Sequence, residues 1–360
     1  MTKMKFLIKS LNGGGAEKVL IDFIREYNLR FGAESLDLLV LLKEGALLNH
    51  DLPNSVSYVY TPKNIFHRYY CLCKLLLNRR KIAKDYFDTN EDYIGVSFLE
   101  GWTDMILNSF KSKHTLKKVS WLHCNIALFK SISPVRLLFE RYASRSDKLN
   151  CVSNNVKNMI PNQGRFNQIQ VVYNFINLNN IRQLSQEYSP NLNIANDNFL
   201  FVGRLNYQKN IFLLLDSFSI YLESNSNSVL HIVGDGELLE SLKKRCSDLE
   251  ISANVCFHGF LKNPYPFIRT CDTICITSFC EGLPTVIIEA ACLQTKVVST
   301  KCGAEELLSL LDYEPPLSFE PQEYALGLGR TINSRKYHCN FHTMQEYFSF
   351  DAVLSSITDN

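Results

Sequence analysis

The chain has 360 residues, of which 46% are hydrophobic and 21% are charged, and these values exclude a largely disordered protein. This length favours two domains, each large enough to bury its own core. The formal net charge of +2 hides an uneven distribution, because residues 1–180 carry 25 Lys and Arg against 15 Asp and Glu, whereas residues 181–360 carry 13 against 21. The basic half indicates an anionic partner, with an accident of surface composition as the alternative. The acidic second half, which has no known nucleic-acid motif, disfavours a nucleic-acid binder.

The sequence contains no apolar run long enough for a signal peptide or a membrane-spanning helix. Its twelve cysteines form no C-x-x-C pair and stand mostly in apolar strings, which is typical of reduced, buried thiols. We therefore expect a cytoplasmic protein that contacts membranes at most peripherally, with no metal site and no cofactor.

The first half alternates short apolar runs with longer helical patterns. Continuous rather than alternating apolar runs are typical of parallel strands covered on both faces, and alternation with helices indicates a doubly wound α/β sheet. A helix is predicted from Ala16 to about Phe31, and a basic helical segment covers 67–87. The predicted strands are 3–10, 36–42, 92–99, 117–123, 148–153 and 169–174.

Polar sequence at 177–198 predicts a boundary, after which the α/β pattern restarts. We expect two Rossmann-like doubly wound domains, an N-terminal one at 1–176 and a C-terminal one at 177–340, followed by a closing helical segment at 341–360. The second domain is predicted to contain helices at 210–223, 237–246 and 281–293 and strands at 198–203, 229–236, 253–260, 272–277 and 296–300.

Three glycines, Gly13, Gly14 and Gly15, stand between the first predicted strand and its helix. Glycines at a helix N-terminus allow backbone N–H groups to approach an anion closely, although a plain tight turn explains them equally well. The run does not match the dinucleotide-binding G-x-G-x-x-G, and it lacks the G-K-[ST] of a P-loop.

Two further clusters carry charge next to predicted strand ends. Arg204 and Lys209, in FVGRLNYQKN, can clamp a diphosphate and stabilise its departure, with two solvated loop cations as the alternative. Glu281 and Glu289, in CEGLPTVIIEA, can accept hydrogen bonds from the vicinal hydroxyl groups of a sugar or a ribose, and Gly282 and Leu283 add backbone N–H groups. A helix cap explains Glu281 alone, and a solvated position explains Glu289 alone.

Together, the segments GGGAEKVL, FVGRLNYQKN, GDGELLESLK, VCFHGF and EGLPTVIIEA resemble glycosyltransferase family four, which has the GT-B fold. The segments SFLEGWTDM and KKVSWLHCN resemble bacterial polysaccharide and lipopolysaccharide glycosyltransferases of this family. The resemblance runs from Lys5 to about Leu308. It implies a retaining, metal-independent hexosyltransferase that uses a nucleotide diphosphate sugar, with UDP as the expected nucleotide.

The resemblance also implies roles for individual residues. Glu281 faces the donor sugar, and His123 lies near that sugar from the N-terminal domain, although a satisfied core histidine is an equal alternative. Arg204 and Lys209 bind the diphosphate. Donor-binding roles fall to Gly13, Gly14, Gly15, Gly203, Gly259, Phe260, Gly282, Leu283, Glu289 and Glu306. Either a glycosyl-enzyme on Glu281 or front-face attack is compatible with retention.

The resemblance implies that the C-terminal domain holds the nucleotide sugar, that the N-terminal domain binds the acceptor, and that segment 341–360 returns to the N-terminal domain. The acceptor is expected to be a saccharide, and in particular a lipid-linked, lipopolysaccharide or capsule glycan. Segment 67–87 predicts a basic amphipathic helix at an anionic membrane surface, or else an ordinary helix that buries Leu75, Leu76 and Ile82. Two other functions remain open. One is an inactive scaffold or binding protein built on the same fold, and the other is a nucleotide-sugar epimerase.

Overall fold

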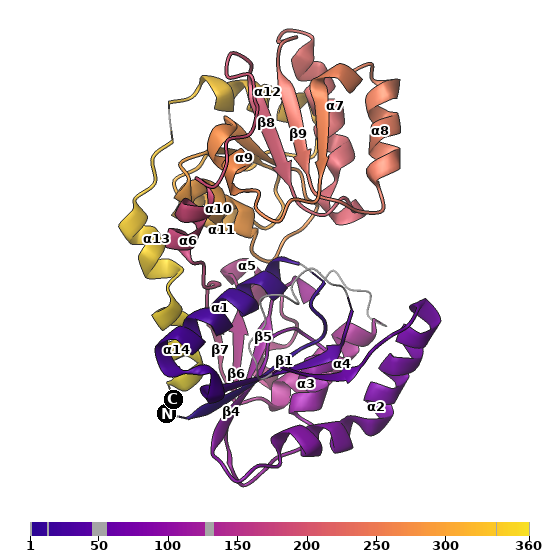
Figure 1. The fold of residues 1–360 in the computed structure, drawn as a ribbon, viewed down its shortest axis with the longest axis vertical. Coiled ribbons are helices and arrows are strands. Elements are labelled where there is room, and N and C mark those ends of the chain that lie inside the picture. Colours follow the sequence, from indigo (N-terminus) through magenta and orange to yellow (C-terminus); the bar gives the residue numbers. More distant parts are fainter. Residues whose placement is uncertain (1, 13, 45–55, 127–132, 336, 360) are drawn as a thin grey trace. The chain divides into compact units, whose positions relative to one another are not determined.

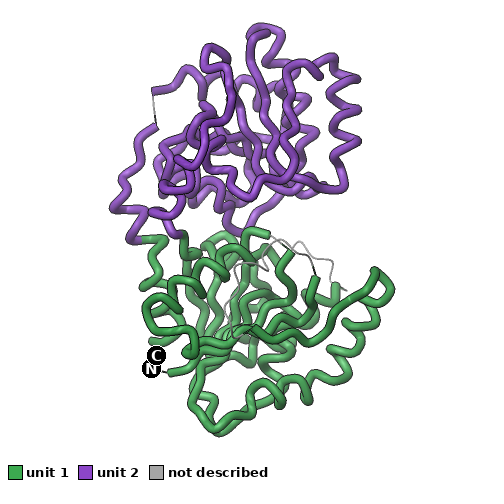
Figure 2. The backbone as a smooth tube through the Cα atoms, in the orientation of Figure 1, with its two compact units in different colours: residues 1–176, 347–360 green, residues 177–346 purple. Residues whose placement is uncertain are grey.

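The computed structural model describes all residues except 1, 13, 45–55, 127–132, 336 and 360. The chain divides into two compact units (Figure 2), one formed by residues 1–176 and 347–360 and the other by residues 177–346. Each unit holds one parallel sheet with helices on both sides (Figure 1). The prediction of a two-sheet, doubly wound α/β chain is therefore confirmed.

The first unit contains a seven-stranded sheet in the order β3-β2-β1-β4-β5-β6-β7. Its central strands β1 and β2 are mostly buried and mainly apolar, so that both faces of the sheet bury side chains against helices. The strands are β1 (Lys3–Ile8), β2 (Leu36–Leu42), β3 (Val56–Tyr60), β4 (Tyr93–Ser97), β5 (Thr115–Leu122), β6 (Lys148–Cys151) and β7 (Ile169–Val171). The helices are α1 (Gly15–Phe31), α2 (Ile65–Phe87), α3 (Trp102–Leu107), α4 (Pro134–Tyr142), α5 (Asn154–Asn158) and α14 (Phe350–Thr358).

The second unit contains a five-stranded sheet in the order β10-β9-β8-β11-β12. An apolar cluster joins this sheet to α7 and α12 through residues such as Phe199, Phe218 and Tyr324. The strands are β8 (Asn198–Val202), β9 (Val229–Val233), β10 (Val255–Gly259), β11 (Thr273–Ile276) and β12 (Lys296–Ser299). The helices are α6 (Leu178–Leu184), α7 (Ile211–Leu222), α8 (Leu239–Asp248), α9 (Tyr265–Thr270), α10 (Thr285–Cys292), α11 (Glu305–Leu310), α12 (Pro321–Asn333) and α13 (Phe341–Tyr347).

The structure contains three local features that the sequence did not predict. The first sheet has an additional edge strand, β3, whose short sequence VSYVY was not recognised. Helix α6 lies inside the polar segment that was interpreted as a linker, and its N-terminus is capped by the side chain of Asn177, which accepts the N–H of Asn180. The closing segment is helical as predicted, and it is divided into two helices because Ser349 caps the second one by accepting the N–H of Ala352.

The C-terminal helix α14 packs on the first unit. Phe350 stacks on Phe23 of α1 with ring centroids 4.9 Å apart, and Arg30 donates to Asp351 at 2.9 Å. Asn150 of β6 donates to Ser356 at 3.1 Å. These contacts attach α14 to α1 and β6 of the same unit.

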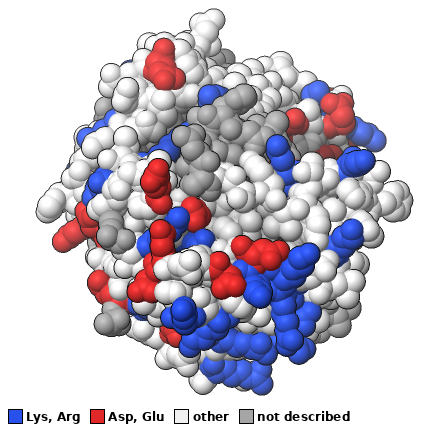
Figure 3. All heavy atoms as spheres, turned by 60° about the horizontal axis from the view of Figure 1, so that its bottom comes forward, with Lys and Arg blue, Asp and Glu red and all other residues white. Residues whose placement is uncertain are grey.

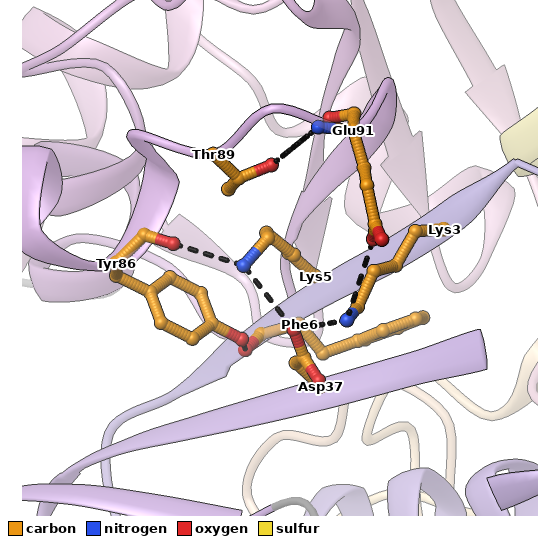
Figure 4. A network of polar contacts seen from close by, with 7 residues as sticks. All are labelled: Lys3, Lys5, Phe6, Asp37, Tyr86, Thr89 and Glu91. Atoms are coloured by element: carbon orange, nitrogen blue, oxygen red, sulfur yellow. Dashed lines mark hydrogen bonds and ion pairs between the residues drawn. The ribbon is translucent and has the colours of Figure 1, made fainter. Parts of the chain in front are cut away.

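The amino ends of β1 and β2 hold a polar network (Figure 4). The Lys5 ammonium group is almost fully buried, and it donates to Asp37 Oδ2 at 3.2 Å and to the Tyr86 carbonyl at 2.9 Å. Lys3 reaches the same carboxylate at 3.3 Å and Glu91 at 3.8 Å. A buried ammonium group requires such partners, so the network is a structural feature of the sheet. An open hollow of about 620 Å³ beside it lies at the amino ends of the strands, whereas open α/β sheets bind ligands at the carboxyl ends.

Candidate active site

The strand order places a topological switch point in each sheet. Successive strands run outward from β8 to β10 on one side and from β11 to β12 on the other, so the chain reverses direction between β8 and β11. In the first unit, the corresponding point lies between β1 and β4. Ligands of open α/β sheets bind outside the carboxyl ends of strands at such points. The loops that follow these four strands are therefore the expected positions of ligand-binding residues.

Several hydrogen bonds join the loops after β8 and β11. The hydroxyl group of Thr277 donates to the Lys209 carbonyl at 2.9 Å. The N–H of Phe279 donates to the Gln208 carbonyl at 2.9 Å, and the side-chain amide of Gln208 donates to the Cys280 carbonyl at 2.8 Å. The two segments that carry the predicted cations and carboxylate therefore form one continuous surface.

At the centre of this surface, Lys209 and Glu281 form an ion pair, with Nζ and Oε1 2.6 Å apart. The hydroxyl group of Ser278 donates to the same oxygen at 2.5 Å, and the Glu281 N–H donates to the Cys302 carbonyl at 2.6 Å. The Glu281 side chain is 11% exposed and that of Lys209 is 24% exposed. One site thus offers a cation for a phosphate and a carboxylate for hydroxyl groups, at the edge of solvent.

Arg204 is exposed on the same loop, and it forms no ion pair with any of the described residues. Its backbone is fixed, since Leu205 donates to the Asp235 carbonyl at 2.9 Å and accepts the N–H of Leu238 at 3.0 Å. A Cβ atom on Gly234 would lie 1.8 Å from the Gly203 carbonyl oxygen, so glycine is required for this contact between the loops after β8 and β9. The guanidinium group therefore extends from a rigid loop.

Glu289 lies on α10 and is 8% exposed. The Tyr265 hydroxyl group, from α9, donates to its Oε1 at 3.3 Å. The alternative in which Glu289 occupies a solvated helix face is therefore wrong. Gly282 and Leu283 lie directly before the helix, whose N-cap is Pro284.

The other predicted donor-binding residues of this unit also follow strands. Gly259 ends β10 in a left-handed conformation with φ of 67°, and Phe260 beside it is half-exposed. Glu306 lies in the first turn of α11, after β12. The carboxyl ends of β8, β10, β11 and β12 therefore each precede a predicted site residue, which is the edge expected for a ligand.

In the first unit, His123 follows β5 and lies beside the loop after β4. Its backbone N–H donates to Glu100 Oε2 at 3.2 Å, and the thiol of Cys124 donates to Glu100 Oε1 at 3.1 Å. The imidazole ring contacts Phe98 at a centroid distance of 4.6 Å, and its Nε2 atom is buried without a hydrogen-bond partner in the described part of the chain. Burial lowers the pKa of His123 to about 3, so the ring is neutral near pH 7.

Of the glycine run, Gly14 is the N-cap of α1 and its carbonyl accepts the N–H of Lys18 at 3.1 Å, while Gly15 begins the helix. Gly13 lies outside the described residues. This loop follows β1, at the switch point of the first sheet.

Sequence reasoning did not single out two residues that organise the site, Glu100 and Ser278. Each follows a strand end and contacts a predicted residue. A signal existed for both, because Glu100 is the first charged residue after the apolar run YIGVSFL and Ser278 stands three residues before Glu281. Within the described ranges, the structure shows no group of three or more His, Cys, Asp or Glu side chains arranged to hold a metal.

No helix among the described residues is both long enough and apolar enough to cross a membrane.

Comparison with protein families identifies a match to the glycosyl transferases group 1 over residues 186–308. An uncharacterised glycosyltransferase of Methanocaldococcus jannaschii is 31% identical over 260 residues, which cover 69% of this chain and 63% of that protein. An N-acetylgalactosamine-N,N'-diacetylbacillosaminyl-diphospho-undecaprenol 4-alpha-N-acetylgalactosaminyltransferase of Campylobacter jejuni is 25% identical over 85% of this chain and 83% of its own.

Among solved structures, Anabaena HepE in complex with UDP and glucose superposes with a TM-score of 0.71 at 22% identity. The match covers 100% of this chain and 96% of HepE. At this identity the likeness shows the fold. The resemblance to GT-B glycosyltransferases and to bacterial polysaccharide enzymes, expected from the sequence motifs, is confirmed.

Proposed function

Because the chain carries a group 1 glycosyl transferase domain at residues 186–308 and has the GT-B fold, we propose that it is a retaining hexosyltransferase. It transfers a hexosyl group from a nucleotide diphosphate sugar to a saccharide acceptor. The observation that carries this proposal is the Lys209–Glu281 pair at the switch point of the second sheet, where a diphosphate and a sugar would require a cation and a carboxylate side by side. The UDP bound to HepE supports UDP as the nucleotide.

We assign the donor to the second unit. Lys209 and Arg204 bind the diphosphate and stabilise the negative charge that develops as it leaves. Glu281 accepts hydrogen bonds from hydroxyl groups of the donor sugar, and Glu289 accepts hydrogen bonds from those of the ribose. Gly203, Gly259, Phe260, Gly282, Leu283 and Glu306 line the donor site.

In the first unit, His123 helps to bind the donor sugar, and Gly13, Gly14 and Gly15 help to bind its phosphates. The unpartnered Nε2 atom of His123 supports this role, since a buried imidazole nitrogen gains a hydrogen bond when it meets a sugar hydroxyl group.

The contacts of Glu281 favour front-face attack over a covalent intermediate. Lys209 and Ser278 both contact its Oε1 atom, so a nucleophilic attack by this oxygen would have to give up two hydrogen bonds. In the front-face route, the acceptor hydroxyl attacks the anomeric carbon from the side on which the diphosphate leaves, and the departing phosphate takes the proton. The carboxylate then orients the sugar instead of bonding to it.

We propose that the reaction needs no divalent metal, because Arg204 and Lys209 supply two positive charges at the diphosphate. The test is sugar transfer from a panel of UDP- and GDP-sugars to lipid-linked saccharides in the presence and absence of EDTA. Transfer that resists EDTA and is lost in Glu281→Ala supports the proposal. Donor conversion without an acceptor would indicate an epimerase instead, and binding without turnover would indicate an inactive scaffold.

We propose that the acceptor is lipid-linked or part of a lipopolysaccharide or capsule glycan, and that α2 contacts an anionic membrane on its cytoplasmic face. The Campylobacter relative carries undecaprenol in its name, which supports a lipid-linked acceptor. Leu75 is fully buried, but Leu76 and Leu77 are exposed. An ordinary surface helix is expected to bury Leu75, Leu76 and Ile82, and α2 leaves Leu76 in contact with solvent.

The outward face of α2 presents an apolar stripe followed by positive charges. Phe66, Tyr70 and Leu77 are exposed at spacings of four and seven residues, which place them on one face of the helix. Lys81 and Lys84 continue this face toward its C-terminus. Figure 3 shows Lys and Arg side chains clustered together on the lower part of the molecular surface in that view. Apolar rings with neighbouring cations match the interface of an anionic bilayer.

Vesicle co-sedimentation tests this contact. Binding to vesicles with anionic lipid, little binding to neutral vesicles, and loss in a Phe66→Ser, Leu77→Ser double variant would support the proposal. Equal binding of the double variant and the wild-type protein would refute it. Ile194→Ser, which changes an exposed aliphatic side chain of the second unit, is the control.

A further inference from the structure

The second unit exposes an aromatic cluster next to the Lys209–Glu281 pair. The rings of Tyr207 and Phe279 lie 5.1 Å apart between centroids, and those of Phe279 and Phe319 lie 5.7 Å apart. Their exposed fractions are 75%, 40% and 38%, respectively. Burying an aromatic side chain is strongly favourable, so a contiguous exposed set indicates a binding surface.

The backbone holds this cluster in a fixed position. Tyr207 stands two residues before Lys209, and Phe279 stands two residues before Glu281. The hydrogen bonds between Gln208 and residues 279 and 280 join the two loops at this point. The same contacts that position the ion pair therefore position the rings beside it.

We propose that Tyr207, Phe279 and Phe319 form an aromatic platform that binds a pyranose ring of the saccharide acceptor. The negative face of an aromatic ring attracts the C–H groups on the apolar face of a pyranose, and the hydroxyl groups at the sugar's edge remain free for hydrogen bonds. The adjacent tilts of 34° and 39° give a shallow curved surface rather than a flat slot. This inference rests on the proposed glycosyl transfer.

Other occupants fit the cluster less well. A stable protein interface uses roughly 20–30 residues on each side, whereas the platform has three rings. A membrane patch combines aliphatic and basic side chains, as on α2, whereas the platform is aromatic only. A nucleobase is expected near Gly259 and Phe260, after β10, which lies two strands away from β8 in the sheet.

Steady-state kinetics test the platform. Tyr207→Leu and Phe279→Leu keep apolar volume but remove the aromatic face, and each should raise the KM for the acceptor about two- to tenfold. Leu326→Ala, at an exposed position on α12 outside the platform, should behave as wild type. The KM for the nucleotide sugar and the rate of donor hydrolysis without acceptor should change less than about twofold. A raised donor KM would assign the rings to the nucleotide and overturn the proposal.

Saturation-transfer NMR separates failure of the platform from failure of the proposed function. The probes are maltotriose and chitotriose, and the protein is the full chain with Glu281→Ala, which removes the expected chemistry but leaves the rings. Transfer to sugar-ring protons that is lost on adding Tyr207→Leu and Phe279→Leu supports the platform, even if no donor is turned over. No transfer to either probe, or transfer that the two substitutions leave unchanged, overturns it. Leu326→Ala, at an exposed position on α12, is the control.

Discussion

Replacing Lys209 with methionine tests the central ion pair most directly. The substitution keeps an apolar stem of similar length and removes the ammonium group, which lies 2.6 Å from Glu281 Oε1. It leaves the carboxylate with Ser278 as its side-chain partner. The substitution should lower both the stability and the transfer rate, because the lysine stabilises both the folded state and the proposed transition state.

The stability cost follows from the burial of the pair. Exposed pairs contribute about 0–1 kcal/mol, whereas breaking a fully buried pair costs about 3–5 kcal/mol. With side chains 11% and 24% exposed, and with Ser278 still donating to Glu281, we expect a loss of about 1–2 kcal/mol, or about 2–8 °C in Tm. The catalytic cost is larger, since removing one group that stabilises developing negative charge lowers the rate about 100- to 1000-fold.

The assay compares kcat/KM for sugar transfer with the free energy of unfolding in urea. Lys243→Met is a matched control, because Lys243 pairs with Glu240 at 2.9 Å on the exposed face of α8. The control should change stability by less than about 0.5 kcal/mol and leave transfer unchanged. A rate loss below about tenfold for Lys209→Met, with the protein folded, would refute the role of Lys209 at the diphosphate.

Two further predictions concern the fold that supports the site. Gly234→Ala should destabilise the protein by more than about 2 kcal/mol in urea unfolding, because its Cβ would overlap the Gly203 carbonyl oxygen, whereas Gly164→Ala meets nothing within 4 Å and should have little effect. Asp104 is fully buried, which raises its pKa to about 7, so the native state retains a proton that the unfolded chain releases above about pH 4. Stability should fall as pH rises from about 4 to 7, and Asp104→Asn should remove this dependence; an unchanged slope would contradict it.

The sequence was sufficient to predict most of the sheet strands, because continuous apolar runs such as LDLLVLL have few other interpretations. It failed at β3, where five residues of VSYVY are only partly buried at the sheet edge and lack that signature. It also failed at α6, since NLNNIRQL is polar by composition, and the helix depends on the Asn177 cap and on burial of Leu178 and Ile181.

The residues of the site were easier to find than their partners. Arg204, Lys209 and Glu281 are charged residues next to strand ends, and the sequence shows this directly. The pairing of Lys209 with Glu281 depends on β8 and β11 being neighbours, although their first aligned positions, Phe199 and Thr273, are 74 residues apart in the sequence. Sheet order of this kind is a tertiary property, which local patterns do not encode.

His123 indicates how the proposed reaction handles its proton. Burial holds the pKa of its ring near 3, below the unfolded value of 6.5, so the folded protein keeps a neutral imidazole between these values. Between pH 6.5 and 3 the unfolded chain binds the proton instead, so the stability that the neutral ring contributes is present above pH 6.5 and is lost as pH falls.

A neutral ring that does not titrate near pH 7 orients hydroxyl groups rather than acting as a general base, which agrees with proton transfer to the leaving phosphate. We therefore expect His123→Gln to lower kcat without changing the shape of its pH profile between about pH 6 and 8, and to reduce the loss of stability in acid. The measurements are kcat and urea unfolding at each pH, with His338→Gln as the control. If the wild-type profile has a limb near pH 6.5 that His123→Gln abolishes, the histidine takes the proton and front-face transfer to the phosphate is wrong.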